Sequence, residues 1–390
     1  MGAGRRFLLR RFALIAVFSG TSFQLFSCAQ NRESNEMMLF VGTYTSGDSE
    51  GVYAYKFNPE TGDLKFANKA AAADPSFLAI HPNGRFLYAV NELLEFDGRP
   101  TGTVSAFSVD ENDGGLTLLN QIESQGGAPC HISLDRTGKW ALVANYVSGT
   151  IASFPILEDG SLGEAASVVQ HEGSSVNPKR QEGPHAHQIF ADASNKFVFA
   201  TDLGLDKILI YRFDAATGAL SPNAPPFVET EPGAGPRHFA LHPELPFGYV
   251  INELNSTITR FDFDGQTGAL TRGESVSTLP DDFEGDSYCA DVHISPDGRF
   301  LYGSNRGHNS IVVCEIAQDS GKLTPIQHIS TEGEWPRNFT IDPTGKFLLV
   351  ANQHTNNIAV LKIDQASGKL SSTGKNYDIP TPVCLQFLTP

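Results

Sequence analysis

The sequence predicts an all-β fold, a seven-bladed β-propeller with four antiparallel strands in each blade. The first observation behind this prediction is a phrase that occurs seven times: an alternating apolar and polar strand, an acidic turn that contains glycine, and the start of another strand. The copies begin at Gly51, Gly102, Gly149, Lys207, Ser256, Asn309 and Asn356. A period of about 50 residues with several strands in each unit is typical of a β-propeller.

A second sequence motif occurs between the copies of the first. A turn with Pro or Asp and usually Gly is followed by a β-branched and aromatic run, as in HPNGRFLYAVNE from His81 and DPTGKFLLVANQ from Asp342. This pattern predicts a tight hairpin that leads into a strand. An apolar segment such as PSFLAI, from Pro75, precedes each turn. One unit is therefore four strands, which we letter A to D from the inside of the ring outward.

The two ends of the repeat region complement each other. MLFVGTYT, from Met38, already has the pattern of a strand B, so the first unit lacks its strand A. PVCLQF, from Pro382, has the pattern of a strand A with no strand B after it. We therefore expect one domain over residues 38–390, in which the C-terminal strand closes the ring and removes exposed sheet edges.

The chain is acidic, with 44 Asp and Glu against 28 Lys and Arg and a net charge of −16. Nucleic-acid binding requires a basic surface, so we do not expect this class of function. Most of the acidic residues fall in the turns between strands C and D, where Asp caps a turn and keeps the surface soluble.

The N-terminal segment does not fit the repeat. It combines an arginine-rich start, a short apolar stretch over residues 12–20, and LFSC at Leu25–Cys28. The apolar stretch is too short to span a bilayer, and residues 1–28 have the pattern of an export signal. The segment resembles the bacterial lipoprotein signal, in which the cysteine becomes lipid-modified and N-terminal. We expect a periplasmic or cell-envelope lipoprotein that contacts the membrane only through the lipid on Cys28, with residues 29–37 as a tether. Simple export is the alternative.

The repeat also predicts which residues gather at one mouth of the central channel. Strands A and B are antiparallel, so the start of A and the end of B lie on the same face. These positions hold an unusual set of polar and ionisable side chains. They are His131, His185, His187, Arg237, His238, Glu253, His293, Arg306, Arg337 and Asn338. We interpret the Asn that recurs at the end of strand B as structural, together with the turn residues His81 and His242.

These residue types indicate a particular chemistry. Arginines bind a carboxylate or phosphate through planar, bidentate hydrogen bonds. A histidine or glutamate can transfer a proton near neutral pH, and an arginine beside a carbonyl oxygen stabilises developing negative charge. The set suits the addition of water to an ester or lactone of an anionic substrate, without a serine nucleophile. A calcium-assisted lactonase with oxygen ligands is conceivable, but the arginines disfavour a cation, and we expect no metal or cofactor.

The same segments resemble the seven-bladed-propeller lactonase family over about residues 38–387. The motifs that carry the resemblance are LFVGTYT from Leu39, PHAHQ from Pro184, GPRH from Gly235, ADVHISPDGRFLYGSNR from Ala290, and WPRNFTIDPTGKFLLVANQ from Trp335. The family includes the bacterial 6-phosphogluconolactonase of propeller type and the fungal carboxy-muconate lactonising enzyme.

The resemblance implies a lactone hydrolase whose small-molecule substrate is a sugar-type lactone. Carried over by motif, its catalytic set is His187, Arg237, Glu253 and Arg306, with His185 as the less favoured register of the histidine and Arg337 as a further anion-binding residue. Two alternatives remain open: a lactonising cycloisomerase of the muconate type, and a non-catalytic propeller that binds a partner at a surface.

The substrate that the resemblance implies does not match the expected cellular location of the protein. A phosphorylated sugar lactone is a cytosolic metabolite, whereas residues 1–28 predict export. An unphosphorylated or carboxylated lactone outside the cytosol is therefore the competing expectation.

The lipoprotein prediction is tested by Cys28→Ser. Stable anchoring depends on the acyl chains, so this variant should move from the membrane to the soluble exported fraction, as measured by immunoblotting of cell fractions. Cys314→Ser is the control and should leave the distribution unchanged. Membrane retention of the Cys28 variant would contradict the prediction, as would cytosolic native protein with Met1 intact.

Overall fold

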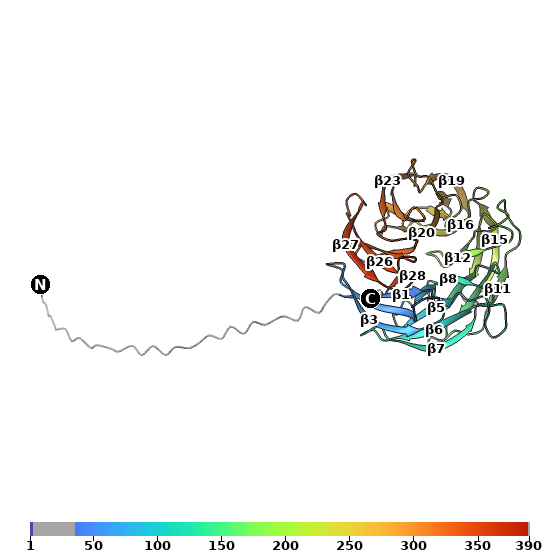
Figure 1. Ribbon diagram of the computed structural model, residues 1–390, viewed down its shortest axis with the longest axis horizontal. Coiled ribbons are helices and arrows are strands. Elements are labelled where there is room, and N and C mark those ends of the chain that lie inside the picture. Colours follow the sequence, from blue (N-terminus) through green and yellow to red (C-terminus); the bar gives the residue numbers. More distant parts are fainter. Residues whose placement is uncertain (3–35, 389–390) are drawn as a thin grey trace. The chain divides into compact units, whose positions relative to one another are not determined.

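The computed structural model describes residues 1–2 and 36–388, so the predicted export signal, its Cys28 and most of the tether lie outside the described residues. Residues 36–388 form seven antiparallel sheets of four strands each, arranged as a ring (Figure 1). The predicted seven-bladed propeller is confirmed. No helix in the described part of the chain has the length and hydrophobicity needed to cross a bilayer.

Each blade runs from an inner to an outer strand, and we number the blades in chain order. Blade 1 contains β28 (Pro382–Phe387), β1 (Met37–Thr43), β2 (Gly51–Phe57) and β3 (Leu64–Ala71). Blade 2 contains β4 (Phe77–Ile80), β5 (Phe86–Asn91), β6 (Thr103–Val109) and β7 (Leu116–Glu123). Blade 3 contains β8 (Pro129–Leu134), β9 (Trp140–Asn145), β10 (Thr150–Pro155) and β11 (Ser167–Gln170).

The remaining four blades follow the same order. Blade 4 contains β12 (Ala186–Ala191), β13 (Phe197–Asp202), β14 (Lys207–Asp214) and β15 (Ala219–Glu229). Blade 5 contains β16 (Pro236–Leu241), β17 (Phe247–Asn252), β18 (Thr257–Phe263) and β19 (Leu270–Ser277). Blade 6 contains β20 (Tyr288–Ile294), β21 (Phe300–Arg306), β22 (Ser310–Ile316) and β23 (Leu323–Ser330). Blade 7 contains β24 (Pro336–Ile341), β25 (Phe347–Asn352), β26 (Asn357–Ile363) and β27 (Leu370–Asp378).

The core lies between the blades rather than inside any one of them. Each of the seven pairs of neighbouring blades shares one buried apolar cluster. The second strands are buried along their whole length because both faces of the sheet are covered, as in β5 and β25. The outermost strands, such as β7, are largely exposed. One repeat unit therefore cannot bury its own apolar faces, and the ring is needed for stability.

The residues interpreted as structural hold turns and loops together. The amide of Asn145 donates to the carbonyl of Ser124 (2.9 Å), and Asn91, Asn305 and Asn352 make the equivalent bond in their blades. His242 bonds the carbonyl of Gly298 in the next blade's turn (2.8 Å). His81 does the same with Gly138. These contacts confirm the structural interpretation.

The C-terminal strand closes the ring as predicted. β28 pairs antiparallel with β1, from Leu39 opposite Phe387 to Thr43 opposite Pro382. Leu385, which is 1% exposed, packs into the cluster shared by blades 7 and 1. The closing strand therefore contributes a buried apolar face as well as backbone hydrogen bonds.

Leu385→Ala tests the contribution of this closing strand. Truncating a fully buried leucine leaves a cavity, so the free energy of unfolding should fall by about 2–5 kcal/mol, as measured by denaturant titration. Leu118→Ala, at a side chain that is 55% exposed, is the control and should change it by less than about 0.5 kcal/mol. An equal effect of the two substitutions would contradict the role given to β28.

Candidate active site

A bulge near the start of the inner strands positions three of the predicted residues. The pairing of β12 with β13 skips His187, that of β16 with β17 skips Arg237, and that of β24 with β25 skips Arg337. A bulged residue is unpaired and its side chain is turned away from the regular alternation. The three side chains therefore occupy equivalent places in their blades. The equivalent bulged residue of β8 is Cys130.

The buried carboxylate of Glu253, just after β17, joins residues from three parts of the chain. Its Oε2 lies 2.6 Å from Nη2 of Arg306 and 3.2 Å from Nε of Arg237, and its Oε1 accepts a hydrogen bond from Arg180 (2.6 Å). We call Glu253, Arg180, Arg237 and Arg306 the arginine cluster. Sequence reasoning missed Arg180, because it lies in the loop between β11 and β12, outside the repeated phrases.

The charges of the arginine cluster shift its pKa values. Burial by itself would raise the pKa of Glu253, but Arg306, Arg237 and Arg180 together lower it to about 2. Burial, with the positive charges of Arg306 and Arg337, lowers the pKa of Arg237 to about 9. Glu253 is therefore ionised at neutral pH, and its carboxylate permits three guanidinium groups to lie in contact with it.

His187 lies beside this cluster as a buried, neutral imidazole. Its ring is 5.2 Å from that of His238 and 5.7 Å from that of Tyr146. Burial, followed by the positive charge of Arg237, holds the pKa of His187 well below its usual range. Its Nδ1 has no hydrogen-bond partner among residues 36–388. A neutral imidazole with a free nitrogen can accept a proton.

Two aromatic rings support the outer arginines. The guanidinium of Arg306 lies 5.3 Å from the centre of the Trp335 ring, and that of Arg337 lies 5.4 Å from the Tyr44 ring. The hydroxyl of Tyr44 donates to Glu92 (2.8 Å), whose other oxygen is 3.9 Å from Arg337.

The four arginines at this mouth outnumber the carboxylates with which they pair. Arg180, Arg237, Arg306 and Arg337 are four cations, and they face the two carboxylates of Glu92 and Glu253. The surplus of positive charge suits an anionic ligand.

Of the predicted binding residues, His185 lies at this mouth. Its ring stacks on Tyr146 at 4.6 Å and its Nδ1 donates to the Tyr146 carbonyl (3.0 Å). Because Tyr146 also contacts Arg180 and the ring of His187, His185 lies next to the arginine cluster.

Four other predicted binding residues, His131, His238, His293 and Asn338, lie deeper in the channel than His185. All four line a cavity of about 540 Å³ that also contacts Arg136 of the turn between strands A and B, on the opposite face. An inner strand advances about 3.3 Å per residue, so positions after the bulge lie progressively farther from the mouth. His238 borders both regions, since its Nε2 is 3.4 Å from Nη1 of Arg237.

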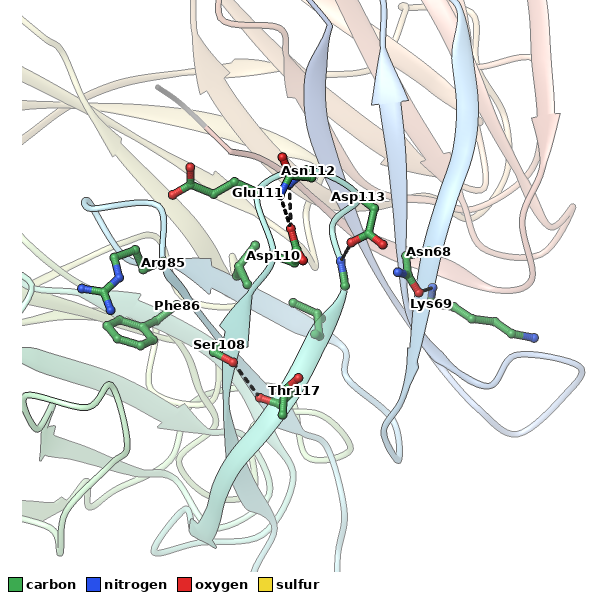
Figure 2. Close-up of a pocket in the computed structure, with 13 residues that line it drawn as sticks. Asn68, Lys69, Arg85, Phe86, Ser108, Asp110, Glu111, Asn112, Asp113 and Thr117 are labelled. Carbon is green, nitrogen blue, oxygen red and sulfur yellow. Dashed lines mark hydrogen bonds between the residues drawn. The ribbon is translucent and has the colours of Figure 1, made fainter.

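An open groove between blades 1 and 2 is unrelated to these residues (Figure 2). It has a volume of about 760 Å³ and is lined by Lys69, Arg85 and the acidic turn over residues 110–113. In that turn, Asp110 accepts two hydrogen bonds from Asn112, and Asp113 accepts one from the amide of Gly115. The carboxylates of Asp110 and Asp113 are therefore bonded within their own turn, and the groove contains no predicted site residue.

Residues 47–51 match the Gly-x-Ser-x-Gly pattern of serine hydrolases, but not its structural context. Ser49 lies in the connection between the antiparallel strands β1 and β2, not in a turn from strand to helix. Its hydroxyl is buried and bonded to that of Thr43 (2.6 Å). The contacts of Ser49 give no support to a serine nucleophile.

Comparisons with known proteins agree with the fold. The family model described as "Lactonase, 7-bladed beta-propeller" matches residues 38–387. The 6-phosphogluconolactonase of Bacillus subtilis is 38% identical over 90% of this chain and 97% of its own length. That of Formosa agariphila is 35% identical over 78% of this chain and 86% of its own length. The solved structure of the periplasmic gluconolactonase of Pseudomonas aeruginosa is 33% identical, with a TM-score of 0.86, over 91% of this chain and 99% of that one.

Glu253→Gln tests the electrostatic role of the buried carboxylate. The pKa of Glu253 is about 2, below its ordinary 4.5, so ionisation stabilises the fold above pH 4.5, and this contribution is lost as the pH falls toward 2. The variant should lower the free energy of unfolding by about 3–5 kcal/mol at pH 7. The difference from the unsubstituted protein should shrink below pH 4.5, as measured by denaturant titrations at several pH values.

Glu60→Gln is the matched control, because the carboxylate of Glu60 is exposed and pairs with the half-exposed Lys346. It should change the stability by less than about 1 kcal/mol. A stability difference for Glu253→Gln that does not vary with pH would contradict the assignment.

Proposed function

This chain belongs to the seven-bladed β-propeller lactonase family and is a lactone hydrolase, and we propose that it opens a sugar-type lactone that carries an anionic group. The observation that carries this proposal is the arginine cluster beside a neutral histidine. The surplus arginines supply anion binding, and His187 supplies a base that is unprotonated at neutral pH.

The proposed reaction begins with the ring carbonyl directed at Arg237 and Arg306. Their N–H groups polarise the carbonyl and stabilise the oxyanion that forms when water attacks. His187 takes a proton from the attacking water. The bond between the carbonyl carbon and the ring oxygen then breaks, and the protonated His187 returns its proton to the departing alkoxide.

Glu253 has a different role in this proposal. With a pKa of about 2 it carries no proton to donate at neutral pH, and it is a weak base because three arginines bind its oxygens. Its carboxylate instead holds Arg180, Arg237 and Arg306 around the position of the reacting carbonyl. The contacts favour His187 over Glu253 as the residue that activates water, because arginines bind both oxygens of Glu253, whereas Nδ1 of His187 has no hydrogen-bond partner among residues 36–388.

Which lactone the protein hydrolyses depends on the cellular compartment in which the protein is located. The two relatives named above as 6-phosphogluconolactonases favour a phosphorylated substrate, whereas the relative described as a periplasmic gluconolactonase favours an unphosphorylated one. Export through residues 1–28, with lipid attachment at Cys28, would place this chain in the periplasm or cell envelope. We therefore propose an extracytoplasmic sugar lactone with a carboxylate or phosphate group.

A panel of lactones tests the proposal by proton release at constant pH. The panel contains glucono-1,5-lactone, its 6-phosphate, a uronic acid lactone and a muconolactone. At least one anionic sugar lactone should show a higher kcat/KM than the neutral parent. Hydrolysis no faster than the spontaneous rate for every sugar lactone would refute the proposal, and reversible turnover of the muconolactone alone would favour the cycloisomerase.

Two variants assign the roles within the same assay. His187→Gln should lower kcat by about 10²–10⁴-fold, the range of general acid–base catalysis, and Glu253→Gln by about 10²-fold or more. Because His187 must be neutral and its pKa lies well below 6.5, activity should be constant through neutral pH and fall only in more acidic solution. His187→Gln should abolish that acidic limb. His81→Gln, in a turn on the opposite face, is the control and should keep both rate and profile.

A further inference from the structure

A second buried carboxylate, that of Asp291, lies directly beneath the arginine cluster and has no part in the reaction proposed above. Its Oδ1 is 2.7 Å from Nδ1 of His238, and its Oδ2 is 3.0 Å from Nε2 of His293. Oδ2 also accepts a hydrogen bond from the side-chain amide of Asn338. Asp291 is 3% exposed, so its charge acts through these neighbours rather than on solvent.

The protonation states of the Asp291–His238 pair follow from its surroundings. Burial would raise the pKa of Asp291, but His293 and His238 hold it well below its usual range. Burial, then the charge of Arg237, lowers the pKa of His238 to about 4. An ionised carboxylate beside a neutral imidazole fixes one tautomer: Nδ1 of His238 carries the hydrogen and donates it to Asp291.

The opposite nitrogen of His238 is therefore an acceptor, and it faces Arg237. Nε2 of His238 lies 3.4 Å from Nη1 of Arg237, which also donates to the carbonyl of Ala290. Nε of the same guanidinium lies 3.2 Å from Glu253. Arg237 is thus held on one edge by Glu253 and on the other by His238 and Ala290.

One irregularity of β20 supplies both supports on that edge. The pairing of β20 with β21 passes from Cys289 to Val292, so Ala290 and Asp291 lie in the bulge. The bulge turns the carbonyl of Ala290 toward Arg237 and the carboxylate of Asp291 toward His238. Further titratable neighbours of His238 are the rings of His131 and His187, at 5.7 and 5.2 Å, and His293, whose charge also lowers the pKa of His238.

We propose that Asp291 and His238 are positioning residues that hold Arg237 in its orientation toward the substrate carbonyl by fixing the tautomer of His238. This inference rests on the function proposed above for Arg237. If His238 carried its hydrogen on Nε2, two donors would oppose each other and the guanidinium would turn away from the oxyanion position. Fixing a neighbouring tautomer is a way in which a buried carboxylate affects a reaction that it does not touch.

The first measurement determines the tautomer of His238 directly and does not require an enzymatic assay. In ¹⁵N NMR spectra of histidine-labelled protein, with the signals of His238 assigned by their loss in His238→Asn, the unsubstituted protein should show the Nδ1–H tautomer at pH 7. The Nε2–H tautomer would overturn the proposal. This readout does not depend on activity, so it decides the tautomer even if no lactone is hydrolysed and the proposed function fails.

The second measurement is a double-mutant cycle on kcat/KM. Asp291→Asn should lower kcat/KM by about 10- to 100-fold, the range that a charge-assisted hydrogen bond contributes. In the Arg237→Ala background, Asp291→Asn should lower kcat/KM by less than about twofold, because Arg237, the residue through which Asp291 acts, is absent. Losses that simply multiply, or a folded Asp291→Asn with kcat/KM within about twofold, would overturn the proposal.

Two further variants guard against a loss of folding. Asp192→Asn is the matched control: Asp192 is another buried carboxylate, but it accepts from the amides of Lys196 and Phe197 in a turn. It should keep kcat/KM within about twofold. If Asp291→Asn does not fold, His238→Asn replaces it in the cycle, since its amide can still donate to Asp291 but offers Arg237 no acceptor. His238→Asn should lower kcat/KM by the same factor as expected for Asp291→Asn, and this loss should likewise disappear in the Arg237→Ala background. The absence of either result would overturn the proposal.

Discussion

The candidate active site depends on one carboxylate, that of Glu253, which is buried among three arginines. Guanidinium groups this close repel one another strongly away from water, and an unpaired buried charge is costly. Glu253 offsets this repulsion because each of its oxygens contacts at least one arginine. The same contacts keep Glu253 ionised, which leaves the proton transfer of the proposed reaction to His187.

The second constraint is the bulge that recurs in the inner strands. It gives His187, Arg237 and Arg337 the same backbone setting in three different blades, and it gives Cys130 that setting in a fourth. The repeat thus provides equivalent positions around one axis, and the residue type at each position decides its chemistry. This arrangement explains how a scaffold of similar blades holds a site without symmetry.

The interior between the two faces is also polar. The arginine cluster faces one end, the cavity of about 540 Å³ opens toward the other, and His238 and Asp291 lie between them. The carboxylates of Glu253 and Asp291 and the ring of His238 each contact a neighbour of opposite charge or complementary hydrogen bonding, as buried polar groups require. A substitution in the cavity can therefore affect Arg237 through His238 without touching the mouth.

The sequence by itself determined the fold and most of the arginine cluster. Alternation and turn chemistry act locally, so the repeated phrases predict the strands, the closure by β28, and the shared face of His187, Arg237, Glu253 and Arg306. Only the tertiary structure decided the rest. Arg180 comes from a loop with no repeat to place it, and His293 and Asn338 lie beyond the bulge, where each residue moves the side chain along the axis. The protonation states of Glu253 and His238 likewise follow from charges that approach only when the ring closes.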